Sequence, residues 1–236
     1  MFIRRALSLV LAILWLWPAG LYAQSEALLE ANRRVTALYE SRHYEEVIPF
    51  WRNALEFAEK EFGPNHPTTA SLLDALAQTH HAQGGYVDAE PLYKRSLAIG
   101  EKALGPDHPD VAASLNNLAA LYFARGRYEA AEPLHKRALA IYEIAFGPDH
   151  PDVALSLNNL AGLYSDRGRY EAAEPLLRRA LAVWEKALGP DHPSVAIALE
   201  NYPAVLRKTD RDDEAVKLEV RAKAIRAKHA GANPAN

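Results

Sequence analysis

Hydrophobic and polar positions along the chain follow one pattern that returns every 42 residues. Within residues 105–146, apolar side chains lie three and four positions apart in two successive runs. The first run contains Val111, Leu115, Leu118, Ala119, Leu121 and Tyr122, and the second contains Tyr128, Ala131, Leu134, Ala138, Leu139 and Ile141. That spacing is typical of amphipathic helices, whereas a strand would show alternation. Each 42-residue unit therefore predicts a pair of helices.

Glycines mark the ends of these predicted helices. The segment that begins at Gly105 recurs almost unchanged from Gly147, and looser copies begin at Gly63 and Gly189. Each of these glycines is followed by a proline, which prevents the preceding helix from continuing. Gly126 lies between the two apolar runs, where a residue that tolerates the left-handed conformation ends a helix. The predicted unit is helix, tight turn, helix and short loop.

The pattern divides residues 24–229 into about five units, of which the first and last are the most divergent. Arg42 replaces the turn glycine in the first unit, Asp210 replaces it in the last, and terminal repeats are expected to be atypical. Pro203 stands where sibling units carry a small alanine, which predicts a kink. Residues 230–236 lack the pattern and predict a disordered tail. The units cover about 25–62, 66–104, 108–146, 150–188 and 192–229.

Small residues recur at positions where helices must approach closely. In the first helix of a unit this position is an alanine, and in the second helix another alanine recurs early. A single helix pair cannot bury its apolar face alone, whereas stacked neighbours can. We therefore expect these side chains to be buried between repeats. They are Ala77, Ala119 and Ala161 in the first helices and Ala89, Ala131, Ala173 and Ala215 in the second.

The N-terminus has the features of a secretory signal peptide. Residues 1–23 begin with a basic segment, continue with an uncharged apolar run and reach small residues before Gln24. Pro18 and Gly20 favour cleavage after Ala23, and we expect an exported, periplasmic protein of a Gram-negative bacterium. The alternative is an uncleaved membrane anchor, because residues 6–23 are near the lower length for a membrane span. Membrane contact is expected only in that case.

Composition narrows the possible functions. The chain has no cysteine, so an exported form would depend on helix packing and not on disulfides. The formal net charge is −3, and removal of Arg4 and Arg5 with the signal peptide makes it −5. This mild acidity argues against general nucleic-acid binding.

The sequence holds no motif for catalysis. It lacks a phosphate-binding glycine loop, a zinc-helix motif and a nucleophile elbow, so we expect no enzyme activity, no cofactor and no small-molecule substrate. A histidine recurs in each loop, as His66, His108, His150 and His192. Neighbouring helices pack about 8–10 Å apart, so equivalent histidines cannot share an ion that needs bonds of about 2 Å. We expect them to begin helices and predict no metal site.

Three segments follow one another in the unit, LNNLA, GRYEAAEPL and GPDHP. Through these segments the unit resembles the kinesin-light-chain type of tetratricopeptide repeat, which is also widespread in bacteria. The resemblance covers roughly everything after residue 25. The usual repeat has about 34 residues, so each unit here carries about eight more. The resemblance implies an all-α fold, a right-handed α-solenoid of helix-turn-helix repeats.

The resemblance also implies a concave groove lined by the first helices, in which an asparagine before a leucine holds a peptide backbone. By position that asparagine is Asn117, Asn159 or Asn201, and an amide offers both donors and an acceptor. Two of these follow another asparagine, and the alternative is that one of each pair braces the neighbouring repeat. The candidate groove residues are Asp74, Gln78, Asn116, Asn117, Phe123, Asn158, Asn159, Asn201 and Arg207.

These observations predict a non-catalytic scaffold that binds a peptide segment or a helix of a protein partner. The alternative is a structural module of the cell envelope that self-associates through the exposed ends of its array.

Overall fold

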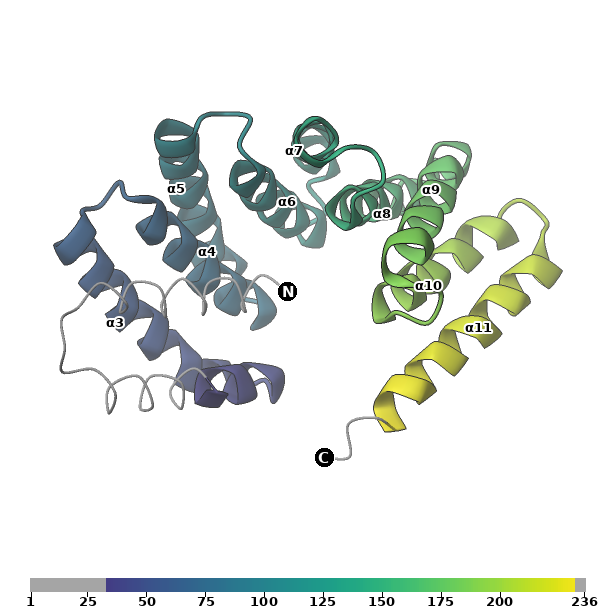
Figure 1. Ribbon diagram of the computed structural model, residues 1–236, viewed down its shortest axis with the longest axis horizontal. Helices are drawn as coiled ribbons and strands as arrows, with labels where there is room; N and C mark the ends of the chain where they lie inside the picture. Colours follow the sequence, from purple (N-terminus) through teal and green to yellow (C-terminus); the bar gives the residue numbers. More distant parts are fainter. Residues whose placement is uncertain (1–32, 232–236) are drawn as a thin grey trace. The chain divides into compact units, whose positions relative to one another are not determined.

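The computed structural model describes residues 33–231, and these residues form α-helices joined by short turns and loops (Figure 1). The all-α class and the helix-turn-helix repeats are thereby confirmed. The expected signal peptide at residues 1–23 lies outside the described residues. Residues 33–40 are helical, and the helices that follow are α3 (Tyr44–Phe62), α4 (Pro67–Ala82), α5 (Tyr86–Leu104), α6 (Pro109–Ala124), α7 (Tyr128–Phe146), α8 (Pro151–Asp166), α9 (Tyr170–Leu188), α10 (Pro193–Arg207) and α11 (Asp212–Gly231).

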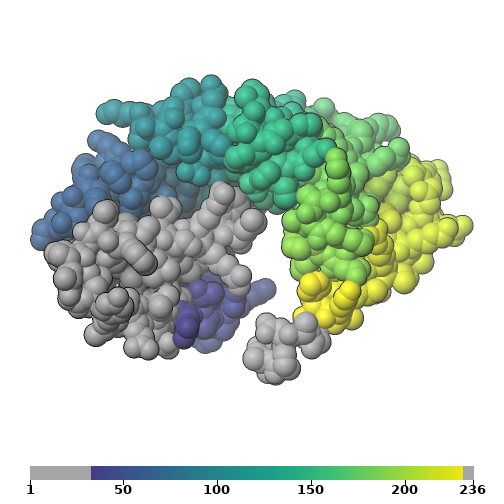
Figure 2. All heavy atoms as spheres, viewed as in Figure 1, coloured from purple at the N-terminus to yellow at the C-terminus, as the bar shows by residue number. Residues whose placement is uncertain are grey.

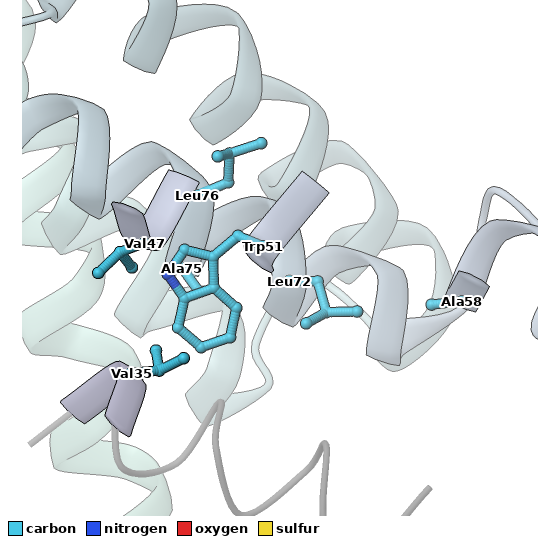
Figure 3. Packing of buried hydrophobic residues seen from close by; sticks show 7 residues of the cluster. All are labelled: Val35, Val47, Trp51, Ala58, Leu72, Ala75 and Leu76. Atoms are coloured by element: carbon cyan, nitrogen blue, oxygen red, sulfur yellow. The ribbon is translucent and has the colours of Figure 1, made fainter. Parts of the chain in front are cut away.

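The chain divides into two compact units, the first ending at Leu121 and the second beginning at Tyr122. In unit 1, α4 packs against both α3 and α5. The indole of Trp51 is fully buried there among aliphatic side chains of α3, α4 and the helix at 33–40 (Figure 3). The labelled members of this cluster are Val35, Val47, Trp51, Ala58, Leu72, Ala75 and Leu76.

In unit 2, each helix packs against its neighbours in the sequence. α8 contacts α7 and α9, and α10 contacts α9, α11 and, more lightly, α8. Contacts between sequence neighbours are the mark of a repeat array, in which stability comes from successive interfaces. We call α4, α6, α8 and α10 the first helices, and α5, α7, α9 and α11 the second helices.

The small residues of both helix types are buried, as the pattern predicts. The three alanines of the first helices, at 77, 119 and 161, have no exposed surface, and neither do those at 89, 131, 173 and 215 in the second helices. A larger side chain at these positions would push neighbouring helices apart.

The turn between the two helices of a unit requires a positive φ. Gly126 and Gly168 adopt φ of 69° and 68°, and Arg42 and Asp210 adopt 63° and 56° at the equivalent positions. Asparagine and aspartate visit this region more readily than most residues, whereas arginine has no such advantage. The turn geometry therefore survives in the terminal repeats without glycine.

The last two helices, α10 and α11, can be compared with the predicted kink and the predicted tail. α10 continues as one helix through Pro203, which is buried. α11 extends to Gly231, so the first two residues of the segment predicted as a disordered tail, residues 230–236, are helical. None of the helices within residues 33–231 is both long enough and apolar enough to cross a membrane.

Candidate functional site

In unit 2 the first helices keep one side accessible. The accessible positions lie four, three and four residues apart, a spacing that keeps them on one helix face. A Cβ added at Gly162 would meet no atom within 4 Å, so open space lies over this side of α8. The positions are Leu155, Asn159, Gly162 and Asp166 on α8, and Ile197, Asn201 and Ala204 on α10, followed by Lys208 at the C-terminal cap of α10.

The two asparagines of each pair have different surroundings. Asn116 and Asn158, the first members, are buried, with 4% and 5% of their surface exposed. The second members, Asn117 and Asn159, are half-buried, as is Asn201. The Nδ2 group of Asn201 donates a hydrogen bond of 3.0 Å to Oδ1 of Asn158, which ties α10 to α8. Asn158 therefore braces a neighbouring repeat, whereas Asn159 lies on the accessible side.

Asp74 occupies on α4 the position that Asn116 occupies on α6. The Ser114 hydroxyl donates a hydrogen bond of 2.7 Å to Oδ2 of Asp74. Burial raises the pKa of the Asp74 carboxyl to about 7, Asp110 adds to the increase, and the hydrogen bond from Ser114 opposes it. Desolvation disfavours the charged carboxylate, so Asp74 holds its proton more tightly than an exposed aspartate.

Two covered polar atoms on the first helices of unit 1 have no hydrogen-bond partner within residues 33–231. They are the acceptor Oδ1 of Asp74 and the donor Nδ2 of Asn117, and both residues are half-buried as a whole. A peptide backbone presents donors and acceptors that could satisfy such atoms. Gln78, one turn beyond Asp74 on α4, is also half-buried.

Phe123 and Arg207, the remaining predicted groove residues, both contact other side chains of the protein. Phe123 is half-buried and makes an edge contact with the ring of Tyr128, with centroids 5.7 Å apart. Arg207 is exposed, but its guanidinium forms a 2.8 Å ion pair with Glu219 and lies 3.9 Å from Asp212. Arg207 thus joins α10 to α11, and a bound anion would compete with these carboxylates.

The sequence did not predict a set of hydrogen bonds and ion pairs that join successive repeats, which we call the glutamate ties. Glu132 on α7 accepts hydrogen bonds from the Tyr164 hydroxyl at 3.1 Å and from Arg169 at 3.2 Å. Hydrogen bonding to Lys136 is the main cause that lowers the pKa of Glu132, and Tyr164 adds to it. Taken singly, such a carboxylate resembles any solvated surface charge.

The same tie recurs one repeat later. Glu174 on α9 accepts from the Tyr202 hydroxyl at 3.0 Å and from Arg211 at 2.6 Å, and the bond from Arg211 is the main cause that lowers the pKa of Glu174. The arginine follows the glutamate by 37 residues in both cases. That recurrence is the sequence signal that could have revealed the ties.

The loop histidines begin the first helices, as expected. In each case Nδ1 of the imidazole accepts a hydrogen bond of 3.1–3.2 Å from the backbone N–H two residues later. Within residues 33–231 no group of three histidine, aspartate or glutamate side chains is placed to hold a metal ion. The residues that cap in this way are His66, His108, His150 and His192.

Comparison with known families gives a match along almost the whole described chain. The family model described as tetratricopeptide repeat matches four overlapping stretches, residues 36–102, 80–144, 110–183 and 152–228. No curated protein sequence matches the chain.

Solved structures with the same arrangement of helices include proteins of kinesin light chain type. A Podosopora anserina kinesin light chain protein with nearly identical TPR-like repeats is 25% identical, with a TM-score of 0.66 over 84% of this chain and 93% of that one. BtubC (BKLC) from P. vanneervenii is 23% identical, with a TM-score of 0.72 over 97% and 90%. Aspartyl phosphate phosphatase F from Bacillus subtilis is 18% identical, with a TM-score of 0.69 over 89% and 54%. The last two show similarity of fold alone.

Proposed function

Because the chain belongs to the tetratricopeptide repeat family, we propose that it is a non-catalytic scaffold whose first helices bind an extended segment of a protein partner. The fold supports a protein-interaction role in general. The observation that supports the finer proposal is the accessible side of α8 and α10, which carries the half-buried Asn159 and Asn201 and has open space over Gly162.

The chemistry of this side suits a peptide backbone. An asparagine side chain offers two donor hydrogens and an acceptor oxygen, which match the C=O and N–H groups of an extended chain. Leu155 and Ile197 add apolar surface on the same side of α8 and α10, and 37% of Ile197 is exposed. A partner segment with apolar side chains on either side of its hydrogen-bonded backbone would fit this combination.

The compartment is part of the proposal. The basic start and the apolar run of residues 1–23 favour export to the periplasm, with cleavage after Ala23. The alternative function, a self-associating module of the envelope, is favoured by one specific feature of α11, which is treated below.

Peptides selected from a random library against the wild-type protein provide the test. Asn159→Ala should raise the dissociation constant of the selected peptides about two- to tenfold, since a lost hydrogen bond contributes about 0.5–1.5 kcal/mol. Fluorescence anisotropy with labelled peptides measures this change. Asn53→Ala, the same substitution at an exposed position of α3, is the matched control and should leave binding unchanged.

The opposite pattern would identify a structural role for Asn159. In that case the Asn159→Ala variant unfolds at lower urea concentration, while its folded fraction binds the selected peptides normally. Unchanged binding together with unchanged stability would remove Asn159 from the binding surface.

A further inference from the structure

The last helix, α11, departs from its siblings at two surface positions. In the earlier second helices an acid is followed four residues later by a base, and the two side chains form an ion pair of 2.6–2.7 Å. In α11 the same positions hold Val216 and Val220, which are 50% and 62% exposed. The sibling pairs are Glu90–Lys94, Glu132–Lys136 and Glu174–Arg178.

Two exposed valines stabilise α11 less than the residues of its siblings would. Valine is a poorer helix former than glutamate, lysine or arginine, and an i,i+4 ion pair would have stabilised α11 instead. A terminal repeat normally presents a polar outer face to remain soluble. In the space-filling view α11 forms the yellow margin of unit 2 (Figure 2). Val216 and Val220 are therefore best explained by a surface that becomes covered.

The charges around the valines indicate what covers them. Asp213, Val216, Val220 and Lys223 are all exposed and lie three, four and three residues apart, on one face of α11. Neither Asp213 nor Lys223 forms an ion pair of 4.0 Å or less within residues 33–231, and the charge of Lys223 acts only as a minor effect on the neighbouring Glu219. The pattern is symmetric about Leu218, except that the sign of the charge is reversed from one end to the other. Such a surface is complementary to itself when a second copy is turned end for end.

We propose that the outer face of α11 is a self-association surface on which a second copy of this chain packs its own α11 antiparallel. A two-fold axis near Leu218 then places Val216 of each copy against Val220 of the other. The same axis places Asp213 of each copy opposite Lys223 of the other. Every contact occurs twice, as an isologous interface requires.

This interface is independent of the accessible side of the first helices, so it goes beyond the proposed scaffold function. A single pair of helices buries less than the ~1,200–2,000 Å² of a standard stable interface. We therefore expect a weak dimer whose population rises with protein concentration. Sedimentation equilibrium of the purified protein, from the micromolar to the millimolar range, should show monomers and dimers.

Restoring the sibling pattern should remove the dimer. Val216→Glu combined with Val220→Lys converts the apolar centre into the ion pair found in α5, α7 and α9, and should raise the dimer dissociation constant at least about tenfold. Circular dichroism should show unchanged helix content, because both residues are exposed. A dimer that persists unchanged in this folded variant would overturn the proposal.

Charge reversal tests the two-fold arrangement itself. Asp213→Lys alone places like charges opposite each other, as does Lys223→Asp alone, and both should weaken association. The two substitutions together should restore it, because the opposite signs face each other again. Glu171→Lys, at the equivalent exposed position of α9, is the matched control and should have no effect.

Three results would contradict the two-fold contact. They are a wild-type protein that stays monomeric through the millimolar range, a double charge variant that fails to recover association, and growth beyond the dimer. Growth beyond the dimer would indicate head-to-tail stacking, in which different surfaces of the two copies meet.

Discussion

At the scale of single residues, Asp74 shows how one substitution between repeats changes the chemistry of a position. The neighbouring repeats carry Asn116 and Asn158 there, which stay neutral at any pH. The Asp74 carboxyl is held in a covered place with one hydroxyl donor, Ser114, and a second oxygen without a partner. Burial therefore disfavours its ionised form, and unit 1 is less stable when Asp74 is charged.

Asp74→Asn should stabilise the protein at neutral and higher pH. The native pKa of Asp74 is raised from 3.8 to about 7, so the folded state binds the proton more tightly than the unfolded state does. The wild type consequently loses stability as pH rises from about 4 to about 7, whereas the variant has no such contribution. Its advantage should reach about 2–4 kcal/mol at pH ~8 and vanish below pH ~4.

Urea unfolding at a series of pH values measures this difference. Ser71→Ala, at a half-buried position one turn earlier on α4, serves as the control. It should change the free energy of unfolding by the same amount at low and at high pH. A variant whose advantage does not depend on pH would show that Asp74 is ionised without penalty in the native protein.

The histidine caps are a second residue-scale feature. His150 accepts from the backbone N–H of Asp152 at 3.2 Å, and its ring contacts Phe146 with centroids 4.4 Å apart. The imidazole does here what serine, threonine, aspartate or asparagine does at most helix starts. Its larger ring also packs against the end of the preceding helix.

His150→Ala should lower the free energy of unfolding by about 0.5–2 kcal/mol, since the first turn of α8 loses its side-chain acceptor. His150→Asn keeps an acceptor and should lose less, retaining the cap without the contact to Phe146. Thermal and urea unfolding of the two variants measure the difference. Equal losses in both would mean that ring packing, and not the hydrogen bond, stabilises this helix start.

At the scale of helices, the small residues and the glutamate ties have complementary roles. Buried alanines such as Ala161 and Ala173 allow close approach of helices, while Glu132 and Glu174 each reach a tyrosine and an arginine of the next repeat. Hydrogen bonds to charged groups are stronger than neutral ones and depend on geometry. Close packing sets the distance between helices in unit 2, and the ties set their register.

Ala161→Leu tests the packing argument. Overpacking a close helix crossing costs about 1–3 kcal/mol, and Ala161 on α8 has no exposed surface. Ala187→Leu, at an exposed position of α9, makes the same change where there is room and should have little effect. Differential scanning calorimetry of both variants makes the comparison, and equal melting curves would show that the buried face has been misidentified.

At the scale of the whole molecule, the described helices stabilise one another through interfaces between neighbours in the sequence. The described contacts in each unit join helices that are close in sequence, so weakening one interface need not unfold the rest. Ala161→Leu should therefore broaden the melting transition or divide it. Hydrogen exchange should then increase around α8 and α9 before it increases in unit 1.

The period of the apolar residues was sufficient to predict the helices, their turns and the buried alanines. That period is a local property, because 3.6 residues per turn converts spacing into a helix face without knowledge of the partner. The GPDHP loops likewise predicted where first helices begin, and the family resemblance predicted the stacking of repeats. Asn117 and Asn159 could be placed on first helices by the same reasoning.

Tertiary structure decided which polar groups meet. The bond from Asn201 to Asn158 and the bond from Ser114 to Asp74 each join two different helices, and Arg211, just before α11, bonds Glu174 on α9. Spacing within one helix cannot predict such pairs, because they depend on how neighbouring helices pack and on what solvent they exclude. Periodicity therefore determined the helices and their buried faces, while packing between repeats decided the environment, and hence the chemistry, of each polar side chain.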